Sequence, residues 1–133
     1  MNDYLEAMLN FAFDHNISCQ LTNVLSIHTP SGAYPQERRL VINTSWYKPN
    51  QLPFIAAHEI SHILHEDDGI LYFHTDSTRS IEGSADRAAV ALLVDEYHKR
   101  NDEIPNYVNF MRDFEIPASL EDVVKKELRN QYM

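Results

Sequence analysis

The residues His58-Glu59-Ile60-Ser61-His62 read H-E-x-x-H and lie within an apolar segment, residues 52–64. Apolar side chains recur around them at helical spacing, which predicts a helix. Residues four apart lie on one face of a helix, so His58 and His62 present two imidazoles to one point. Imidazole nitrogens bind Zn²⁺ at about 2.0–2.1 Å, and Glu59 beside them can take a proton from a metal-bound water. The motif therefore predicts a zinc site of the hydrolytic type.

A catalytic zinc ion needs a third protein ligand and keeps one position open for water. Glu82 is the first candidate, because it opens a second helical segment, residues 80–97, with the pattern E-x-x-x-D. Glu82 and Asp86 are four apart and share one helix face. We predict that Glu82 binds the metal and that Asp86 accepts the free ring N–H of a ligating histidine.

Other assignments of the third ligand stay open from the sequence. Asp68 follows His58 by ten residues, where one class of zinc proteases has its third ligand, but His65 replaces the glycine expected at the turn. His65 lies on the histidine stripe, yet about 10 Å further along the helix at about 1.5 Å per residue. Its simpler interpretation is a helix-end residue that contacts the last carbonyls. For Glu82 and Asp86 the simpler alternative is a solvated acidic helix start.

The composition indicates one compact domain, residues 1–133, with 44% hydrophobic residues, enough for an ordinary core. The net charge of −9 argues against direct binding of nucleic-acid phosphates. Cys19 is the single cysteine, which excludes an internal disulfide and fits a reducing compartment. The chain shows neither a signal-type segment nor an apolar run long enough for a bilayer. We therefore expect a cytoplasmic protein without membrane association; oligomeric state is not predicted.

The remaining pattern predicts the α+β class in the order helix, strand, strand, helix, helix, helix. Residues 3–15 form an amphipathic helix. Residues 17–27 and 39–46 are strands, and we expect them to pair antiparallel in a small sheet. A peptide substrate could add to the second of these strands. After a break at residues 102–106, a capping pattern at Ser119 begins the last helix, residues 120–131.

The two motifs resemble those of the ImmA/IrrE family of small zinc metallopeptidases, within the gluzincin class. The carrying segments are H-E-I-S-H-I-L-H at residues 58–65 and I-E-G-S-A-D-R-A-A-V-A-L-L at residues 81–93, where the family typically has E-x-x-A-[ND]. The resemblance is strongest over residues 51–93. It implies a zincin-like domain with an N-terminal helix and short sheet, an H-E-x-x-H helix, an E-x-x-x-D helix and C-terminal helices.

Carried over residue by residue, the resemblance makes His58, His62 and Glu82 the zinc ligands, Glu59 the general base and Asp86 the partner of a ligating histidine. Three departures concern the subfamily and target rather than the chemistry. Ser61 stands where many relatives have glycine, Asp86 stands where asparagine is common, and no proline follows residues 92–93. Mn²⁺, Fe²⁺ or Co²⁺ could occupy the same ligands.

The resemblance implies a peptidase that acts on one regulatory protein, because characterised relatives inactivate helix-turn-helix repressors of the phage type and release a mobile element or stress response. Tyr72 and His74 lie between the motifs and are candidate donors to the oxyanion, with aromatic packing as the alternative. A second hypothesis is a zinc-containing regulator that sequesters a repressor or antitoxin without efficient cleavage, with the toxin of a toxin–antitoxin pair as a variant. The size of the partner after incubation separates cleavage from sequestration.

Overall fold

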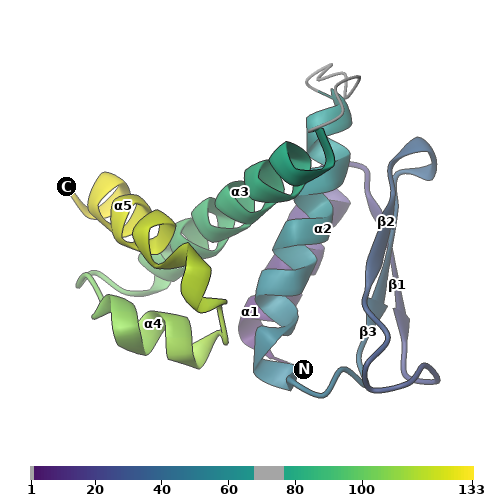
Figure 1. Ribbon diagram of the computed structural model, residues 1–133, viewed down its shortest axis with the longest axis horizontal. Helices are drawn as coiled ribbons and strands as arrows, with labels where there is room; N and C mark the ends of the chain where they lie inside the picture. Colours follow the sequence, from purple (N-terminus) through teal and green to yellow (C-terminus); the bar gives the residue numbers. More distant parts are fainter. Residues whose placement is uncertain (1, 68–76) are drawn as a thin grey trace.

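The computed structural model describes the backbone of residues 2–67 and 77–133, and the side chains of residues 2–65 and 83–133. The sheet lies on one side of the helices α1 and α2, and α3 leads away from them to α4 and α5 (Figure 1). The elements are α1 (Asp3–Asp14), β1 (Ser18–Thr22), β2 (Gly32–Tyr34), β3 (Arg39–Asn43), α2 (Leu52–Asp67), α3 (Ser77–Arg100), α4 (Tyr107–Asp113) and α5 (Glu121–Tyr132), with 3-10 turns η1 (Pro35–Glu37), η2 (Pro49–Gln51) and η3 (Ala118–Leu120). The predicted α+β class is confirmed.

The sheet has the strand order β1-β3-β2. β1 pairs with β3 in parallel, with Ser18 opposite Arg39, so the predicted antiparallel pairing of these two segments is wrong. The connection between them is long enough to return to the same end of the sheet, and it carries β2, which pairs antiparallel with β3. Because β3 is the central strand and β2 covers residues 39–41, the structure excludes peptide addition to that part of β3.

The core between the sheet and the helices follows from the alternation of side chains along β3. Leu40 and Ile42 point to the helices and are completely buried, as strand geometry requires of residues two apart. Leu5, Met8 and Ala12 recur at helical spacing and make the buried face of α1.

Both ends of α1 are fixed by local chemistry. The Asn2 side chain accepts hydrogen bonds from the backbone N–H groups of Tyr4 and Leu5, at 2.7 and 3.1 Å. At the other end Asn16 adopts a left-handed backbone (φ 60°), which asparagine tolerates. The Ile17 N–H then donates back to the Ala12 carbonyl at 2.9 Å, and the Ile17 side chain enters the core.

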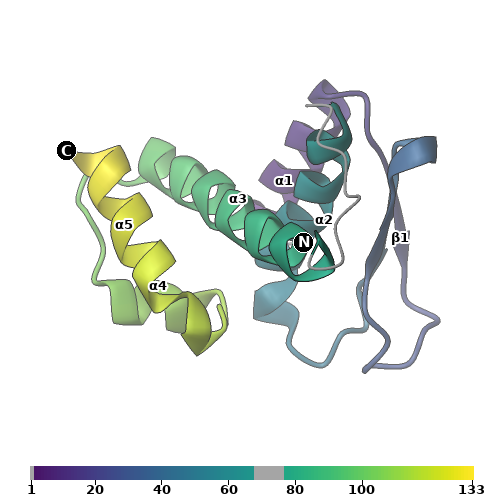
Figure 2. The same cartoon turned by 45° about the horizontal axis from the view of Figure 1, so that its top comes forward.

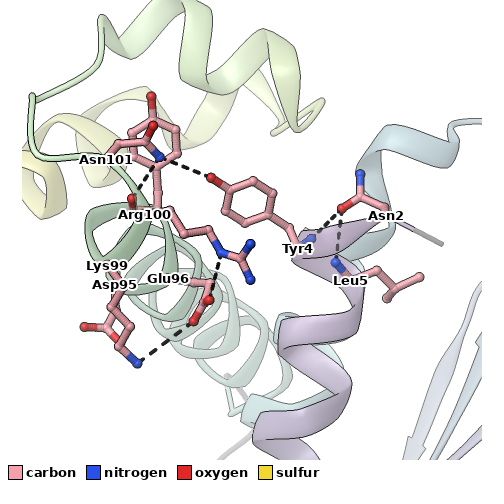
Figure 3. A network of polar contacts seen from close by, with 9 residues as sticks. Asn2, Tyr4, Leu5, Asp95, Glu96, Lys99, Arg100 and Asn101 are labelled. Atoms are coloured by element: carbon pink, nitrogen blue, oxygen red, sulfur yellow. Dashed lines mark hydrogen bonds and ion pairs between the residues drawn. The ribbon is translucent and has the colours of Figure 1, made fainter.

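The start of α1 also packs against the end of α3 (Figure 3). The Asn101 amide donates to the Tyr4 hydroxyl oxygen at 3.3 Å, and Arg100 lies over the Tyr4 ring at 5.1 Å. Burial raises the pKa of Tyr4 above its ordinary value. Tyr132 of α5 donates to the Asn101 carbonyl at 2.8 Å, and burial raises the pKa of Tyr132 in the same direction. Asn101 therefore connects the first and last helices through the end of α3.

Two features of the C-terminal part differ from the sequence prediction. α4 was not predicted as a separate helix. Asn106 caps its start, and its buried side chains are Phe110 and Met111. α5 is confirmed, but the predicted cap at Ser119 is wrong, because the 3-10 turn η3 precedes the helix and no side chain caps it. Of the helices that the structure describes, none combines the length and the apolar character needed to cross a membrane.

Candidate metal centre

Over residues 52–63, α2 is buried on every side except one stripe. Between Leu52 and Ile63 the half-buried residues are Ile55, His58, Glu59 and His62, and all others are buried. They recur at spacings of three and four, so they lie on one face of the helix. The buried face packs against α1, the sheet and α3. The fold therefore leaves open the one face of α2 that bears the H-E-x-x-H residues.

The two histidines converge through the same ring atom. The distance between His58 Nε2 and His62 Nε2 is 3.1 Å. Two nitrogens that bind a tetrahedral zinc ion at about 2.0–2.1 Å are about 3.3 Å apart. One turn of helix thus brings the two nitrogens almost to the separation that a shared metal ion requires.

Asp86 of α3 fixes the orientation of His58. Its Oδ1 lies 2.8 Å from His58 Nδ1. A carboxylate only accepts hydrogen bonds, so Nδ1 is the donor, and in the neutral ring Nε2 then has the lone pair that a metal ligand needs. The side chains of His58 and Asp86 are 16% and 31% exposed, so the pair is partly shielded from water. The role predicted for Asp86 requires this contact, and the role itself stays a prediction.

Glu59 completes a group of potential metal-binding side chains. The ligand atoms of His58, Glu59 and His62 all lie within 4.8 Å of one another, and this is the one such group among the residues that the structure describes. The donor set suits a divalent cation with nitrogen and oxygen ligands, and Glu59 is near enough to act on a water at the same point.

Several predicted site residues lie wholly or partly outside the described part of the chain. Glu82 lies in α3 one turn before Asp86, but its side chain is outside the described side chains. Tyr72, His74 and the alternative ligand Asp68 are outside the described residues altogether. Their roles stay predictions.

His65 does not belong to the described metal-binding group, which consists of His58, Glu59 and His62. Its Nδ1 is buried and has no hydrogen-bond partner among the described residues. The predicted contact between His65 and the last carbonyls of α2 is therefore not seen at this atom.

A cavity of about 200 Å³ opens beside His58 and Glu59. Its other walls come from the loop before β2, from the segment after β3 and from the start of α2, and they are Pro30, Ser31, Trp46, Gln51, Phe54 and Ile55. Apart from Ser31 and Gln51 these walls are apolar or aromatic. Figure 2 shows α3, which contributes Asp86, crossing beside α2 on the side away from the sheet. The cavity can hold a side chain next to the candidate metal centre.

Asn43 holds one wall of this cavity in place. Its buried side chain donates to the carbonyls of Ser26 and Thr29, both at 2.8 Å, and accepts from the Ser45 N–H at 3.0 Å. Its backbone N–H donates to the Ser31 hydroxyl oxygen at 2.9 Å. A buried asparagine satisfied in this way fixes the loop that carries Pro30 and Ser31.

Gln51 holds another wall of the cavity in place. Its Oε1 accepts from the Trp46 indole N–H at 2.8 Å, and its Nε2 donates to the Glu115 carbonyl at 2.9 Å. No role for Asn43, Trp46 or Gln51 was predicted from the sequence. The available signals were weak: a polar residue inside a β-branched strand, and the only tryptophan of the chain.

Comparison with known proteins agrees with this geometry. The family model of the IrrE N-terminal-like domain, peptidase family M78, matches residues 14–121, which include both motifs and the whole cavity. Comparisons with curated proteins and with solved structures gave no match. The predicted resemblance is confirmed, and the chain belongs to the family of IrrE N-terminal-like domains, a family of metallopeptidase type.

Proposed function

We propose that this chain is a zinc-dependent endopeptidase that cleaves a regulatory protein, a helix-turn-helix repressor of the phage type, and thereby derepresses a mobile element or a stress response. The observation that carries the proposal is the pair of His58 and His62 Nε2 atoms, 3.1 Å apart, with the His58 tautomer fixed by Asp86. Membership in a peptidase family supports the reaction class.

The proposed zinc ligands are His58, His62 and Glu82. The histidines supply two ligands with the separation described above, and α3 carries Glu82 one turn before Asp86. These residues would hold a zinc ion, which would supply a Lewis acid and a bound water with a pKa lowered to about 7. Three non-sulfur ligands favour a catalytic over a structural metal site.

Glu59 is the proposed general base. Its carboxylate lies in the same group as the two histidine nitrogens, where it can accept a proton from the attacking water and return it to the leaving amine. Tyr72 or His74 would donate to the oxyanion that develops on the scissile carbonyl.

A basic protein is the proposed substrate. The net charge of −9 favours encounter with a positively charged partner, and DNA-binding repressors carry such surfaces. The cavity beside Glu59 has apolar walls that fit an apolar side chain next to the scissile bond. We place this activity in the cytoplasm, where such repressors act.

The test is cleavage of purified substrate by the zinc-loaded chain. Casein, a proteome-derived peptide library and a purified helix-turn-helix repressor are incubated with the protein, with and without chelator, and analysed by gel electrophoresis and mass spectrometry. We expect cleavage that chelator removes. If no probe is cleaved and the intact repressor is released from its DNA, the result would instead support sequestration. Cleavage that persists without metal would contradict the proposed chemistry.

A further inference from the structure

The open stripe of α2 continues past the histidines toward the beginning of the helix. Gln51 in η2 and Ile55 precede His58 at helical spacing, and both are half-buried, whereas the three residues between them are buried. A chain bound along this stripe would therefore pass over Ile55 and reach Gln51.

A second cavity, of about 590 Å³, lies beyond Gln51, between η2, α4 and η3. We call it the α4 groove, and its apolar walls are Tyr107, Val108, Met111, Ile116 and Pro117. Lys48, Arg112, Glu115 and Glu121 also line it, so both signs of charge are present and no net charge selects its occupant. Gln51 lines this groove and also the cavity beside Glu59, so the two cavities meet at one side chain.

Gln51 is a fixed boundary between them. Both ends of its amide are hydrogen-bonded, one to Trp46 in the first cavity and the other to the Glu115 carbonyl at the second. Glu115 has a left-handed backbone (φ 49°), which turns the chain between α4 and η3. The two cavities therefore keep a constant spacing.

The distance between the two cavities can be expressed as a number of residues in a bound peptide. Gln51 precedes His58 by seven residues, about 10 Å along a helix at about 1.5 Å per residue. An extended peptide advances about 3.3 Å per residue. A side chain about three residues from the scissile bond thus reaches the α4 groove.

We propose that the α4 groove is a second substrate subsite, which binds an apolar side chain about three residues from the scissile bond. The proposal rests on the peptidase function given above. The occupant is an extended segment of the substrate, rather than a second copy of this chain, because the groove and the cavity beside Glu59 share the Gln51 side chain as a wall. The substrate must then present an unfolded segment of at least four residues, with apolar residues at both ends.

The test compares two residues of nearly equal exposure. Val108 is 53% exposed and lines the groove, and Ile104 is 51% exposed and lies outside it. Zinc-loaded wild type, Val108→Glu and Ile104→Glu cleave a proteome-derived peptide library, and mass spectrometry locates the cleavage sites. We expect Val108→Glu to lower kcat/KM on the best ten-residue peptide by about tenfold, the scale of one apolar contact in a substrate pocket, and Ile104→Glu to leave it unchanged. A shorter peptide without the distal residue should be cleaved equally by all three proteins.

Equal behaviour of the two variants on the long peptide overturns the subsite and leaves the peptidase function standing. Hydrogen exchange with Glu59→Gln and the same peptides gives a readout without catalysis. Protection of residues 107–116, with no cleavage by wild type, would support the groove as a peptide site and overturn the peptidase function. Absence of both cleavage and protection would overturn both.

Discussion

The two sides of α2 differ in what fixes their residues. On the buried side, Ala56, Ala57, Ile60 and Ile63 are completely enclosed, and their identity follows from packing. On the open side, His58, Glu59 and His62 are half-buried and bring polar atoms within 4.8 Å of one another. The residues that stabilise the fold and the residues of the candidate metal centre thus lie on opposite faces of one helix. Substitutions on one face should change mainly the free energy of unfolding, and substitutions on the other mainly metal binding or activity.

We expect the largest difference between the effect on activity and the effect on stability at Glu59. Glu59→Gln keeps the size of the side chain but removes the base, so the rate of peptide cleavage should fall about 10²- to 10⁴-fold, the usual contribution of a general base. Zinc content and the free energy of unfolding should change little. The control is Glu103→Gln, at an exposed site away from the cavity. Undiminished cleavage by Glu59→Gln would remove this residue from the mechanism.

The next contrast sets two isoleucines of α2 against each other. Ile60 is completely buried, so Ile60→Ala should lower the free energy of unfolding by about 2–5 kcal/mol, measured by urea denaturation. Ile55 is half-buried on the open stripe, so Ile55→Ala should cost less stability but change the preferred side chain at the cleavage site. Equal stability losses would contradict the distinction between the two faces.

A smaller effect is expected where α3 meets the open face. Asp86→Ala removes the partner of His58 Nδ1 and should weaken zinc binding about 10- to 100-fold, measured by competition with a chelating dye. Asp86→Asn keeps an acceptor and should restore most of the affinity. Asp95→Ala, at an exposed position of the same helix, is the control. If the Ala and Asn variants bind zinc equally weakly, the hydrogen bond to the ring is not the cause.

The smallest effect concerns stability alone, at the far end of α3. Burial raises the pKa of Tyr4 and Tyr132, so above pH 10 the unfolded chain loses these protons before the folded chain does. Their contribution is complete below pH 10 and is lost as the pH rises through the folded pKa values. Tyr4→Phe should reduce the alkaline loss of stability, measured by denaturation at pH 9 and pH 11. If Tyr4→Phe and the wild type lose the same free energy of unfolding between pH 9 and pH 11, Tyr4 does not cause the alkaline loss of stability.

The sequence was most informative where one helix holds the whole pattern. The spacing of His58 and His62 is set by helical geometry, so their convergence could be predicted without tertiary information. The relation of Asp86 to His58 was predicted from chemistry, because a ligating imidazole needs a partner for its other nitrogen. The helix starts near residues 3 and 52 followed from apolar periodicity and were placed within a residue or two. The start near residue 121 was placed equally well, although the capping pattern at Ser119 that predicted it is not formed.

The features that could not be predicted from the sequence depend on contacts between residues far apart in the chain. The direction of the β1–β3 pairing is set by the path of the connection, and the strand residues favour either direction equally. α4 has only seven residues and is stabilised by packing of Phe110 and Met111, so its own periodicity is weak. The bond from Gln51 to Glu115 joins positions 64 residues apart, which no local pattern indicates.

The division of the centre between two helices has a consequence for assembly. A peptide of residues 52–67 would contain both imidazoles, but the carboxylate that selects the proton position on His58 arrives only when α3 docks against α2. High-affinity uptake of the ion should therefore lag behind secondary structure during refolding and report on the tertiary step. If the proposed function holds, a newly made chain acquires peptidase activity only after α3 has docked against α2.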